Sequence, residues 1–427
     1  MVELGLLLSV GKPAVAKEDA RRLSRLLGEA PEGAAWRLRA LETYRDLPVP
    51  DRVQHLWRYT DPRDLLPEQP LSGDLAAVGR GPELPADGPA VLLVPGREPQ
   101  LNAAAADLDV TVSPLLHTAG DVALAGGAVP PQHGLFEALN AAVFNTGALV
   151  RIGPGVRLGE PLRVIVAAVA AATLPRLLIV AEGGSEATIV EEHVGGGEGV
   201  YVVGVSEALV RPNAQLRHVL VQNWSDGTAG HLTQRGLAER DGRYLAVTAT
   251  FGGRRAKLDV GGILDGPGAR SELVGVTLGE KRQHFDHHTL HQHRSGRTWS
   301  NIDYKVALTG RSRSVYTGLI RIEEGAPQSE AYQENRNLLL SDRCRADAIP
   351  ELEILTDDVS CSHGATATPV DPEQLFYLES RGIDPDTALR LVVRGFLETT
   401  LAALPETLRS SLEDMVERRL DGLVGGR

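Results

Sequence analysis

The stretch "GVYVVGVSEALVRPNAQLRHVLVQN" (residues 199–223) decides the fold class of this chain. Two runs rich in β-branched residues are joined by a short polar segment that contains Pro212 and Asn213. Neither run has the apolar spacing of a helix. Similar runs, separated by Gly, Asp or Asn, recur on both sides from about residue 145 to residue 365. Because no helical pattern lies between them, the sequence predicts an all-β body and not a sheet with helical crossovers.

The spacing of these runs is compatible with two architectures. Many short strands at rather even spacing are typical of a large β-sandwich or of a stacked β-solenoid. A solenoid often carries a tight repeat motif, and this sequence shows none. The pattern alone therefore leaves both architectures open.

The residues before the β body have a different texture. From about residue 17 to 60, leucines recur at helical spacing among charged residues, which predicts a small helical subdomain. Residues 61–90 are rich in Pro, Gly and Asp and are typical of a linker. Short strands are predicted in "PAVLLVPG" (89–96) and "DLDVTVSPL" (107–115). We place this N-terminal helical domain at residues 1–142 and the β core at 143–368.

The C-terminal part, residues 369–427, is predicted to be helical. Asp371 and Asp384 are each followed by a proline, which suits the N-cap and first-turn positions of two helices. A third helix is expected in "ETLRSSLEDMVERRLDGL" (406–423). The apolar stripes of these helices can pack on the β body, and they are long enough to dock a partner as well.

Composition excludes several classes of function. The formal net charge of minus 12 disfavours binding to nucleic acid, which needs a basic surface. No apolar run reaches the roughly 20 residues of a membrane span. Two cysteines cannot form a disulfide framework, and the N-terminus lacks the pattern of a secretory signal, so we expect a cytoplasmic protein. The chain also lacks a P-loop motif and a G-x-S-x-G elbow, so nucleotide or acyl hydrolysis is not expected.

The run "HFDHHTLHQH" contains five of the twelve histidines of the chain. If it is a strand, alternation places His287, His291 and His293 on one face and His284 and His288 on the other. Three imidazoles on one face could converge on a metal ion. A β-helix hydrolase or lyase that uses the metal bound by residues 284–293 is therefore the alternative function. Histidines also serve as polar side chains without a ligand, which is the simpler interpretation.

Soft ligands cluster in "RCRADAIPELEILTDDVSCSHGATA", where Cys344 precedes His363 by 19 residues. If one solenoid coil takes about that many residues, the two side chains lie on adjacent coils at the spacing of paired strands, roughly 4.8 Å. A thiolate and an imidazole so placed suit iron or persulfide sulfur. The simpler interpretation is that Cys344 and Cys361 fill the core, as free cysteines often do.

The run from residue 336 to 383, which contains "CSHGAT", closely resembles the signature of the SufB/SufD family of scaffold proteins in the SUF iron–sulfur cluster assembly system. The "LEI…DDV.CSHGAT" portion is more similar to SufD than to SufB. The segments "LPVP…LWRYTD" (47–61), "FEALNAAVFNTG" (136–147), "TWSNIDYKVAL" (298–308) and "YTGLIRI" (316–322) extend the resemblance over most of the chain.

The resemblance implies a mainly β fold: a right-handed parallel β-helix flanked by helical domains. It implies a non-enzymatic scaffold subunit that pairs with a SufB-type subunit through the β-helix and with a SufC-type ABC ATPase through the C-terminal helices. A homodimer is possible for the isolated chain. The implied cofactor is a transient iron–sulfur cluster at the subunit interface, with a flavin possible in the complex and nothing tightly bound to the isolated chain.

The resemblance also assigns site residues. The histidine of "CSHGAT", here His363, is expected at the interface with SufB, near the cysteine of that subunit at which clusters form. Within the histidine run, only a histidine like His293 is common in the family. Cys344 departs from the SufD pattern and is similar to the SufB context of the cluster-building cysteine. We therefore expect His363 and Cys344 to be the ligand candidates, with Cys361 in a supporting role.

Overall fold

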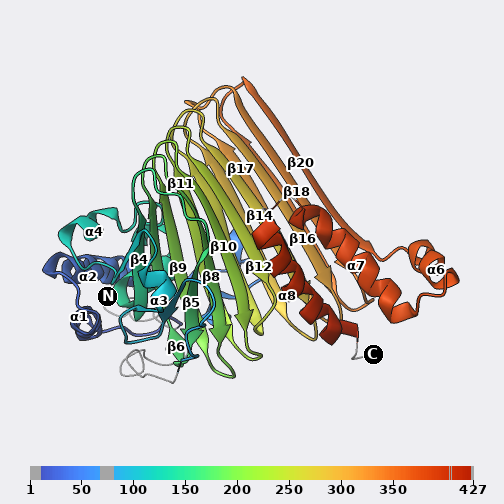
Figure 1. Cartoon of the computed structure of the whole chain (residues 1–427), viewed down its shortest axis with the longest axis horizontal. Helices are drawn as coiled ribbons and strands as arrows, with labels where there is room; N and C mark the ends of the chain where they lie inside the picture. The colour runs from blue at the N-terminus through green and yellow to red at the C-terminus, as the bar shows by residue number, and fades with distance from the viewer. Residues whose placement is uncertain (1–10, 68–80, 403, 405, 425–427) are drawn as a thin grey trace, which may run out of the picture.

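The computed structural model describes residues 11–67, 81–402, 404 and 406–424. It is mainly β, with a parallel β-helix of about eight turns and helices at both ends of the molecule (Figure 1). The solenoid, and not the sandwich, is thus the architecture of the β body. The predicted linker at 61–90 falls partly on residues 68–80, which lie outside the described residues. In the described part of the chain, no helix combines the length and apolarity needed to span a bilayer.

Two long sheets form the walls of the β-helix, and successive strands alternate between them. In order, the parallel strands of sheet A are β5 (Leu162–Ala168), β8 (Glu186–Gly195), β10 (Gln215–Trp224), β12 (Arg243–Thr250), β14 (Arg270–Gly279), β16 (Trp299–Leu308), β18 (Ser329–Leu339) and β20 (Val359–Pro369). Those of sheet B are β4 (Thr146–Ile152), β7 (Pro175–Ala181), β9 (Tyr201–Val210), β11 (Ala229–Ala238), β13 (Arg255–Leu264), β15 (His284–His293), β17 (Arg313–Ile322) and β19 (Arg345–Ile354).

Short strands from the N-terminal part complete the first turns. Sheet A begins with β1 (Ala90–Leu93) and β2 (Gln100–Leu101), which pair antiparallel, and sheet B begins with β3 (Val110–Ser113) antiparallel to β4. A two-residue strand, β6 (Ala172–Thr173), pairs with β9. The N-terminal part therefore closes one end of the β-helix in addition to supplying helices.

One coil of the β-helix is much longer than the 19 residues expected from the spacing of Cys344 and His363. Arg243 pairs with Arg270 in sheet A, 27 positions later, and Arg313 pairs with Arg345 in sheet B, 32 positions later. The supposed coil length is therefore wrong, because each coil contains two strands of about ten residues and two turns. Cys344 and His363 consequently do not occupy paired positions on adjacent coils.

Alternate side chains of each strand face the interior of the β-helix, as the pleat of a strand requires. Leu216, Leu258 and Ile302 are among the buried residues of this core. The interior also holds aromatic side chains, and their rings fit only where the facing residue on the adjacent strand is small. Tyr304 lies over Gly275 of the adjacent strand, where an added Cβ would overlap the ring. The core is therefore packed by rows of side chains whose sizes match from coil to coil.

Most of the N-terminal helices cover the outer face of sheet B (Figure 1). They are α1 (Lys17–Leu26), α2 (Pro31–Asp46), α4 (Ala119–Leu124) and α5 (Leu135–Val143), with the 3-10 turns η1 (His55–Trp57), η2 (Pro62–Leu65) and η4 (Pro131–His133). The short helix α3 (Ala103–Ala106) packs instead against β1 and β2 of sheet A. A buried ion pair joins Arg37 to Glu29 at 2.5 Å within this layer. A second pair, Arg176 with Glu207, lies in sheet B, and Glu207 ties it to the layer by accepting from the backbone N–H of Val129 at 3.0 Å. Arg37 also donates to the carbonyl of Phe144 at 3.0 Å, which fixes α2 against the end of α5.

Two C-terminal helices, α7 (Pro385–Leu401) and α8 (Glu406–Val424), lie on the opposite wall, sheet A. The helix before them, α6 (Pro372–Ser380), contacts α7 and projects from the β-helix (Figure 1). Asp371 and Asp384 cap α6 and α7 as predicted. Leu389, Val393 and Leu397 of α7 pack with the outward apolar side chains of the sheet. Asp303 and Lys305 of β16 bind α7 through the hydroxyl of Thr400 (2.6 Å) and the carbonyl of Phe396 (2.9 Å).

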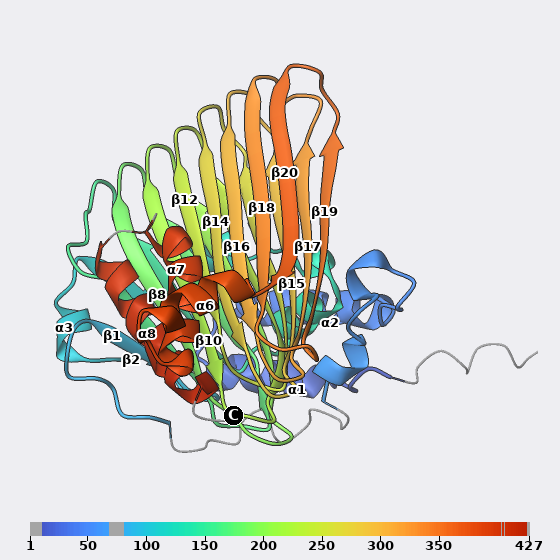
Figure 2. The ribbon, with the colours of Figure 1, turned by 90° about the vertical axis from the view of Figure 1, so that its right-hand side faces the viewer.

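The two ends of the β-helix differ. The first end is closed by the N-terminal strands, whereas β19 and β20 form the last coil and pair with no further strand in the described part of the chain (Figure 2). No residue of β19 or β20 is buried, although most strands before them are largely buried. We call this surface, formed by residues 345–354 and 359–369, the open end.

Candidate functional site

The open end carries the residues that the sequence singled out. Cys361 of β20 is in register with Ala331 of β18, and His363 is in register with Gln333. Ala331 and Gln333 are buried in the interior, with 0% and 3% of their surface exposed. Because paired positions of parallel strands share a face, Cys361 and His363 continue these interior rows into the last coil. There the imidazole of His363 is exposed, and among the described residues it has no hydrogen-bond partner.

The two members of the "CSH" motif have different surroundings. Cys361 is partly buried against the main core, and this burial raises the pKa of its thiol. A thiol with a raised pKa is a weaker nucleophile and metal ligand at neutral pH, because the thiolate is the reactive form. His363 is accessible from outside. The geometry therefore favours His363 over Cys361 as the residue that meets a ligand.

Cys344 lies elsewhere, in the turn between β18 and β19. Its side chain is 8% exposed and packs with Val306 and Leu308. The thiol donates to the carbonyl oxygen of Ser341 at 3.0 Å and lies 3.3 Å from that of Leu308. This is the environment of a cysteine that fills the core. A role of Cys344 as an iron or persulfide ligand stays a prediction.

The histidine run forms β15, and the predicted alternation is confirmed. His287, His291 and His293 face the interior, but each has its own hydroxyl partner: Thr250 (3.2 Å), Ser271 (3.0 Å) and Ser300 (2.8 Å). Burial lowers the pKa of His287 and of His293 to about 4 and that of His291 well below its usual value, so all three are neutral at pH 7. The expected convergence on one metal ion, and the alternative enzyme built on it, are not favoured.

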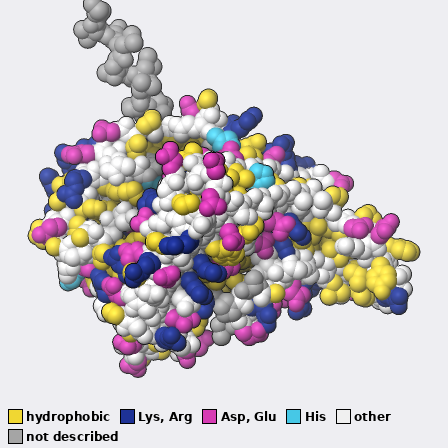
Figure 3. Space-filling model, turned by 90° about the horizontal axis from the view of Figure 1, so that it is seen from above, with side chains coloured by type: hydrophobic (Ala, Val, Ile, Leu, Met, Phe, Trp, Pro, Cys, Tyr) yellow, Lys and Arg dark blue, Asp and Glu magenta, His cyan; other side chains and the backbone are white. Residues whose placement is uncertain are grey.

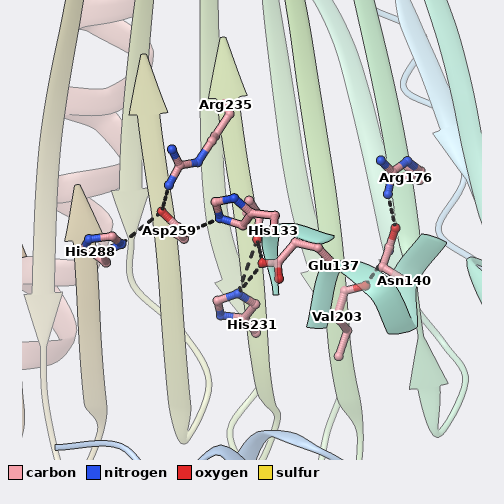
Figure 4. Close-up of polar contacts among 10 residues, drawn as sticks. His133, Glu137, Asn140, Arg176, Val203, His231, Arg235, Asp259 and His288 are labelled. Atoms are coloured by element: carbon pink, nitrogen blue, oxygen red, sulfur yellow. Dashed lines mark hydrogen bonds and ion pairs between the residues drawn. The ribbon is translucent and has the colours of Figure 1, made fainter. Parts of the chain in front are cut away.

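A cluster that the sequence did not reveal lies outside sheet B, where the N-terminal layer meets β11, β13 and β15 (Figure 4). Within the described residues, His133, Glu137 and Asp259 are the single group of three metal-ligating side chains whose ligand atoms lie within 4.8 Å of one another. His133 and Glu137 come from η4 and α5, more than 100 positions before Asp259. No spacing rule connects residues so far apart, which is why sequence reasoning missed them.

The C-terminal helices present a second exposed feature. Phe376 and Tyr377 of α6 are 72% and 58% exposed, which is unusual for adjacent aromatic side chains. Figure 3 shows hydrophobic side chains gathered at the far right of the molecule, the end at which α6 lies in Figure 1. Since α7 and α8 use their apolar faces against sheet A, α6 is the part of this region that is left for a partner.

Comparison with known proteins agrees with these features. A family model described as "SUF system FeS cluster assembly, SufBD core domain" matches residues 164–396. The chain is 33% identical over 314 residues to the iron-sulfur cluster assembly SufBD family protein Rv1462 of Mycobacterium tuberculosis, a match that covers 71% of this chain and 78% of the relative. It is 31% identical over 313 residues to the SufBD family protein ML0594 of Mycobacterium leprae, covering 70% and 78%. The matched core runs from β5 to α7 and includes the open end.

Proposed function

The chain belongs to the SufBD family of the SUF system for iron–sulfur cluster assembly, and from this premise we propose that it is a SufD-type scaffold subunit. In this role it pairs with a SufB-type subunit through the open end of the β-helix. It takes up the movement of a SufC-type ATPase through its C-terminal helices. The scaffold itself performs no hydrolysis, and the iron–sulfur cluster is its cargo.

The exposed last coil supports pairing at the open end. The edges of β19 and β20 carry backbone N–H and C=O groups that no other strand of the described residues binds, and such edges can pair with a strand of another chain. The same surface carries the exposed apolar side chain of Ile354 (39% exposed), and Leu355 (43% exposed) follows it directly in the chain. A partner that also ends in an uncovered β-helix coil can form hydrogen bonds with these backbone groups and can bury these apolar side chains.

His363 is the observation that carries the proposal. It lies on the open end, it is exposed, and its imidazole has no partner among the described residues. When a second subunit covers the open end, the imidazole becomes enclosed at the interface. A neutral imidazole there can bind iron directly or accept a proton from a cysteine of the partner.

The exposed aromatic side chains of α6 support docking of the ATPase. Phe376 and Tyr377 are next to each other, and large aromatic side chains of this kind often anchor interfaces. α6 is followed by α7, which Asp303 and Lys305 bind to β16. A displacement of α6 would therefore reach the β-helix near its open end through α7.

The proposal is tested by co-expression of the chain with SufB-type and SufC-type proteins and by anaerobic measurement of cluster absorbance on the purified complex. We expect His363→Ala to lower the cluster content at least about tenfold. Removal of a group that only orients a metal ligand lowers metal affinity about 10- to 100-fold, and loss of a ligand itself should have at least this effect. Ser362→Ala, an adjacent exposed position, is the matched control and keeps the wild-type content. Cys361→Ala is expected to change it little.

Wild-type cluster content in His363→Ala, with the complex intact on size-exclusion chromatography, would contradict the role of His363. If the chain forms only a stable homodimer and does not bind a SufB-type subunit, the SufD assignment fails. The same experiment with Cys344→Ala determines whether the second ligand candidate takes part.

A further inference from the structure

The cluster between the N-terminal layer and sheet B joins three elements around three ligand side chains. His133 is the last residue of η4, Glu137 lies in the first turn of α5, and Asp259 lies on the outer face of β13. Nε2 of His133 is 2.8 Å from Oδ2 of Asp259. Figure 4 shows the imidazole of His133 between the carboxylates of Glu137 and Asp259.

Neighbouring side chains orient both carboxylates. Glu137 accepts hydrogen bonds from His231 at 3.0 Å and from Thr233 at 2.5 Å. Asp259 binds Arg235 at 2.8 Å and lies 3.2 Å from Nδ1 of His288. Metal sites commonly have such an outer layer, since it fixes the direction of each ligand.

One carboxylate oxygen of the cluster has no hydrogen-bond donor. Both hydrogen bonds to Glu137, from His231 and Thr233, end on Oε1, so within the described residues Oε2 accepts none. The nearby cation Lys257 is bound to Asp286 at 3.0 Å and so is not directed at Glu137 or Asp259.

The cluster also has room and access for a ligand. It lines a cavity of about 400 Å³ whose other walls include Trp57, Leu290 and the turn at Pro48. His133 is exposed at the edge of this cavity, whereas Glu137 and Asp259 are buried. His231, also in the wall, bonds Glu137 through Nε2, and its buried Nδ1 has no hydrogen-bond partner among the described residues.

We propose that His133, Glu137 and Asp259 bind one divalent first-row transition-metal ion. Imidazole and carboxylate ligands suit zinc, manganese or ferrous iron. A metal about 2.1 Å from each ligand atom holds two such atoms no more than about 4.2 Å apart. The three atoms already lie within 4.8 Å of one another, so a small rotation of the side chains closes the site.

This site goes beyond the assembly of clusters at the open end. The ion bridges η4 and α5 to β13 and thereby fastens the N-terminal layer to the middle of sheet B. Its chemical role is structural, since it joins two neighbouring elements of the N-terminal layer to a strand that lies more than 100 positions later in the sequence. The thiols at the open end and in the β18–β19 turn take no part in it.

The test uses the full chain, freed of metal with a chelator, and Co²⁺ as the probe. Cobalt bound by nitrogen and oxygen gives visible d–d absorption without the charge-transfer band of a thiolate, so binding at the cysteines is recognised directly. We expect one Co²⁺ per chain by calorimetry, d–d absorption, and a rise in the melting temperature on addition of Co²⁺.

His133→Gln is the main variant, because glutamine can still donate a hydrogen bond to Asp259 but is a poor transition-metal ligand. We expect it to weaken Co²⁺ binding at least about tenfold and to abolish the rise in melting temperature. His117→Gln is the matched control, since His117 is exposed in the same N-terminal layer and contacts only the carbonyl of Gly28 in that layer at 3.0 Å. It is expected to bind Co²⁺ as the wild type does.

Three results would overturn the proposal: no Co²⁺ binding by the wild type, wild-type binding by His133→Gln, or a thiolate charge-transfer band as the sole signal. If His133→Gln is unfolded without metal, Glu137→Gln replaces it, because this change keeps an oxygen that can accept from Thr233 and His231. Unchanged binding by that variant would equally exclude the site.

Discussion

His363 on β20 lies in register with Gln333 on β18, one coil earlier in the β-helix. Gln333 is 3% exposed and donates across the interior to the carbonyl of Gly318 at 3.4 Å, whereas His363 is exposed. The two residues occupy the same row and differ in one respect: Gln333 has a coil beyond it and His363 does not. The open end is thus a cross-section of the β-helix core presented to a partner.

Pairing through the open end is expected to depend on its apolar rows. Ile354 is in register with Ile322, which is fully buried, and is itself 39% exposed. Ile354→Glu places a charge where the partner covers this row, and burial of an unpaired charge is costly. We expect the dissociation constant for a SufB-type subunit to rise at least about tenfold, or about 1.4 kcal/mol.

The measurement is calorimetry or analytical ultracentrifugation of the two subunits. Leu26→Glu is the control, since Leu26 is 43% exposed on α1, a helix that packs on α2 and α5. Equal dissociation constants for the wild type and Ile354→Glu would place the interface elsewhere.

Docking of the ATPase is expected to depend on α6. Phe376→Glu removes the most exposed aromatic side chain of that helix, and truncation of an aromatic anchor often costs about 2 kcal/mol or more of binding free energy. We expect a SufC-type ATPase to be lost from the co-purified complex while the pairing with a SufB-type subunit is kept. Leu26→Glu, a change at an exposed leucine of α1, should retain the ATPase; if Phe376→Glu retains it as well, the docking surface is not α6.

The packing of rings over glycine makes a prediction about stability. Gly275→Ala introduces a Cβ that overlaps the ring of Tyr304 in the interior, and overpacking of a core costs about 1–3 kcal/mol. Gly159→Ala meets no heavy atom within 4 Å and is expected to change the free energy of unfolding by less than about 0.5 kcal/mol. Urea denaturation of both variants measures this difference. Equal free energies of unfolding for Gly275→Ala and Gly159→Ala would mean that the ring of Tyr304 can move aside to make room for the added methyl group.

The buried histidines predict acid sensitivity. The pKa of His287 and that of His293 are about 4 in the folded protein, because burial disfavours the charged imidazole, against roughly 6.5 in the unfolded chain. Between pH 6.5 and 4 the unfolded state binds protons that the folded state does not, so the free energy of unfolding falls as the pH falls through this window. At pH 5 the loss is about 2 kcal/mol for each histidine.

Denaturation midpoints at pH 7.5 and pH 5 measure this loss. His287→Gln keeps a group that can bond to Thr250 and should reduce the difference between the two pH values by about 2 kcal/mol. His117→Gln, at an exposed position, should leave the difference unchanged. A difference that is the same in all three proteins would show that His287 does not contribute.

Much of the fold could be predicted because local patterns carry it. The β-branched runs gave an all-β body, and the Asp-Pro pairs at 371 and 384 gave the starts of α6 and α7 correctly. The choice of solenoid over sandwich came from the family resemblance and not from the pattern, since both architectures use strands of the same period. The supposed coil length of about 19 residues was wrong. A coil includes its turns, and the alternation of side chains along a strand does not encode the length of a turn.

For the candidate site, the sequence by itself determined which residues have suitable chemistry: a histidine and a thiol in "CSHGAT", and a further thiol at Cys344. Only the tertiary structure decided where they lie, with His363 exposed on the last coil and Cys344 buried in a turn. It also brought Glu137 and Asp259 together across more than 100 residues. The physical reason is that stacking of coils and docking of helices bring together residues that are far apart in the sequence, whereas local propensity reflects only near neighbours in the chain.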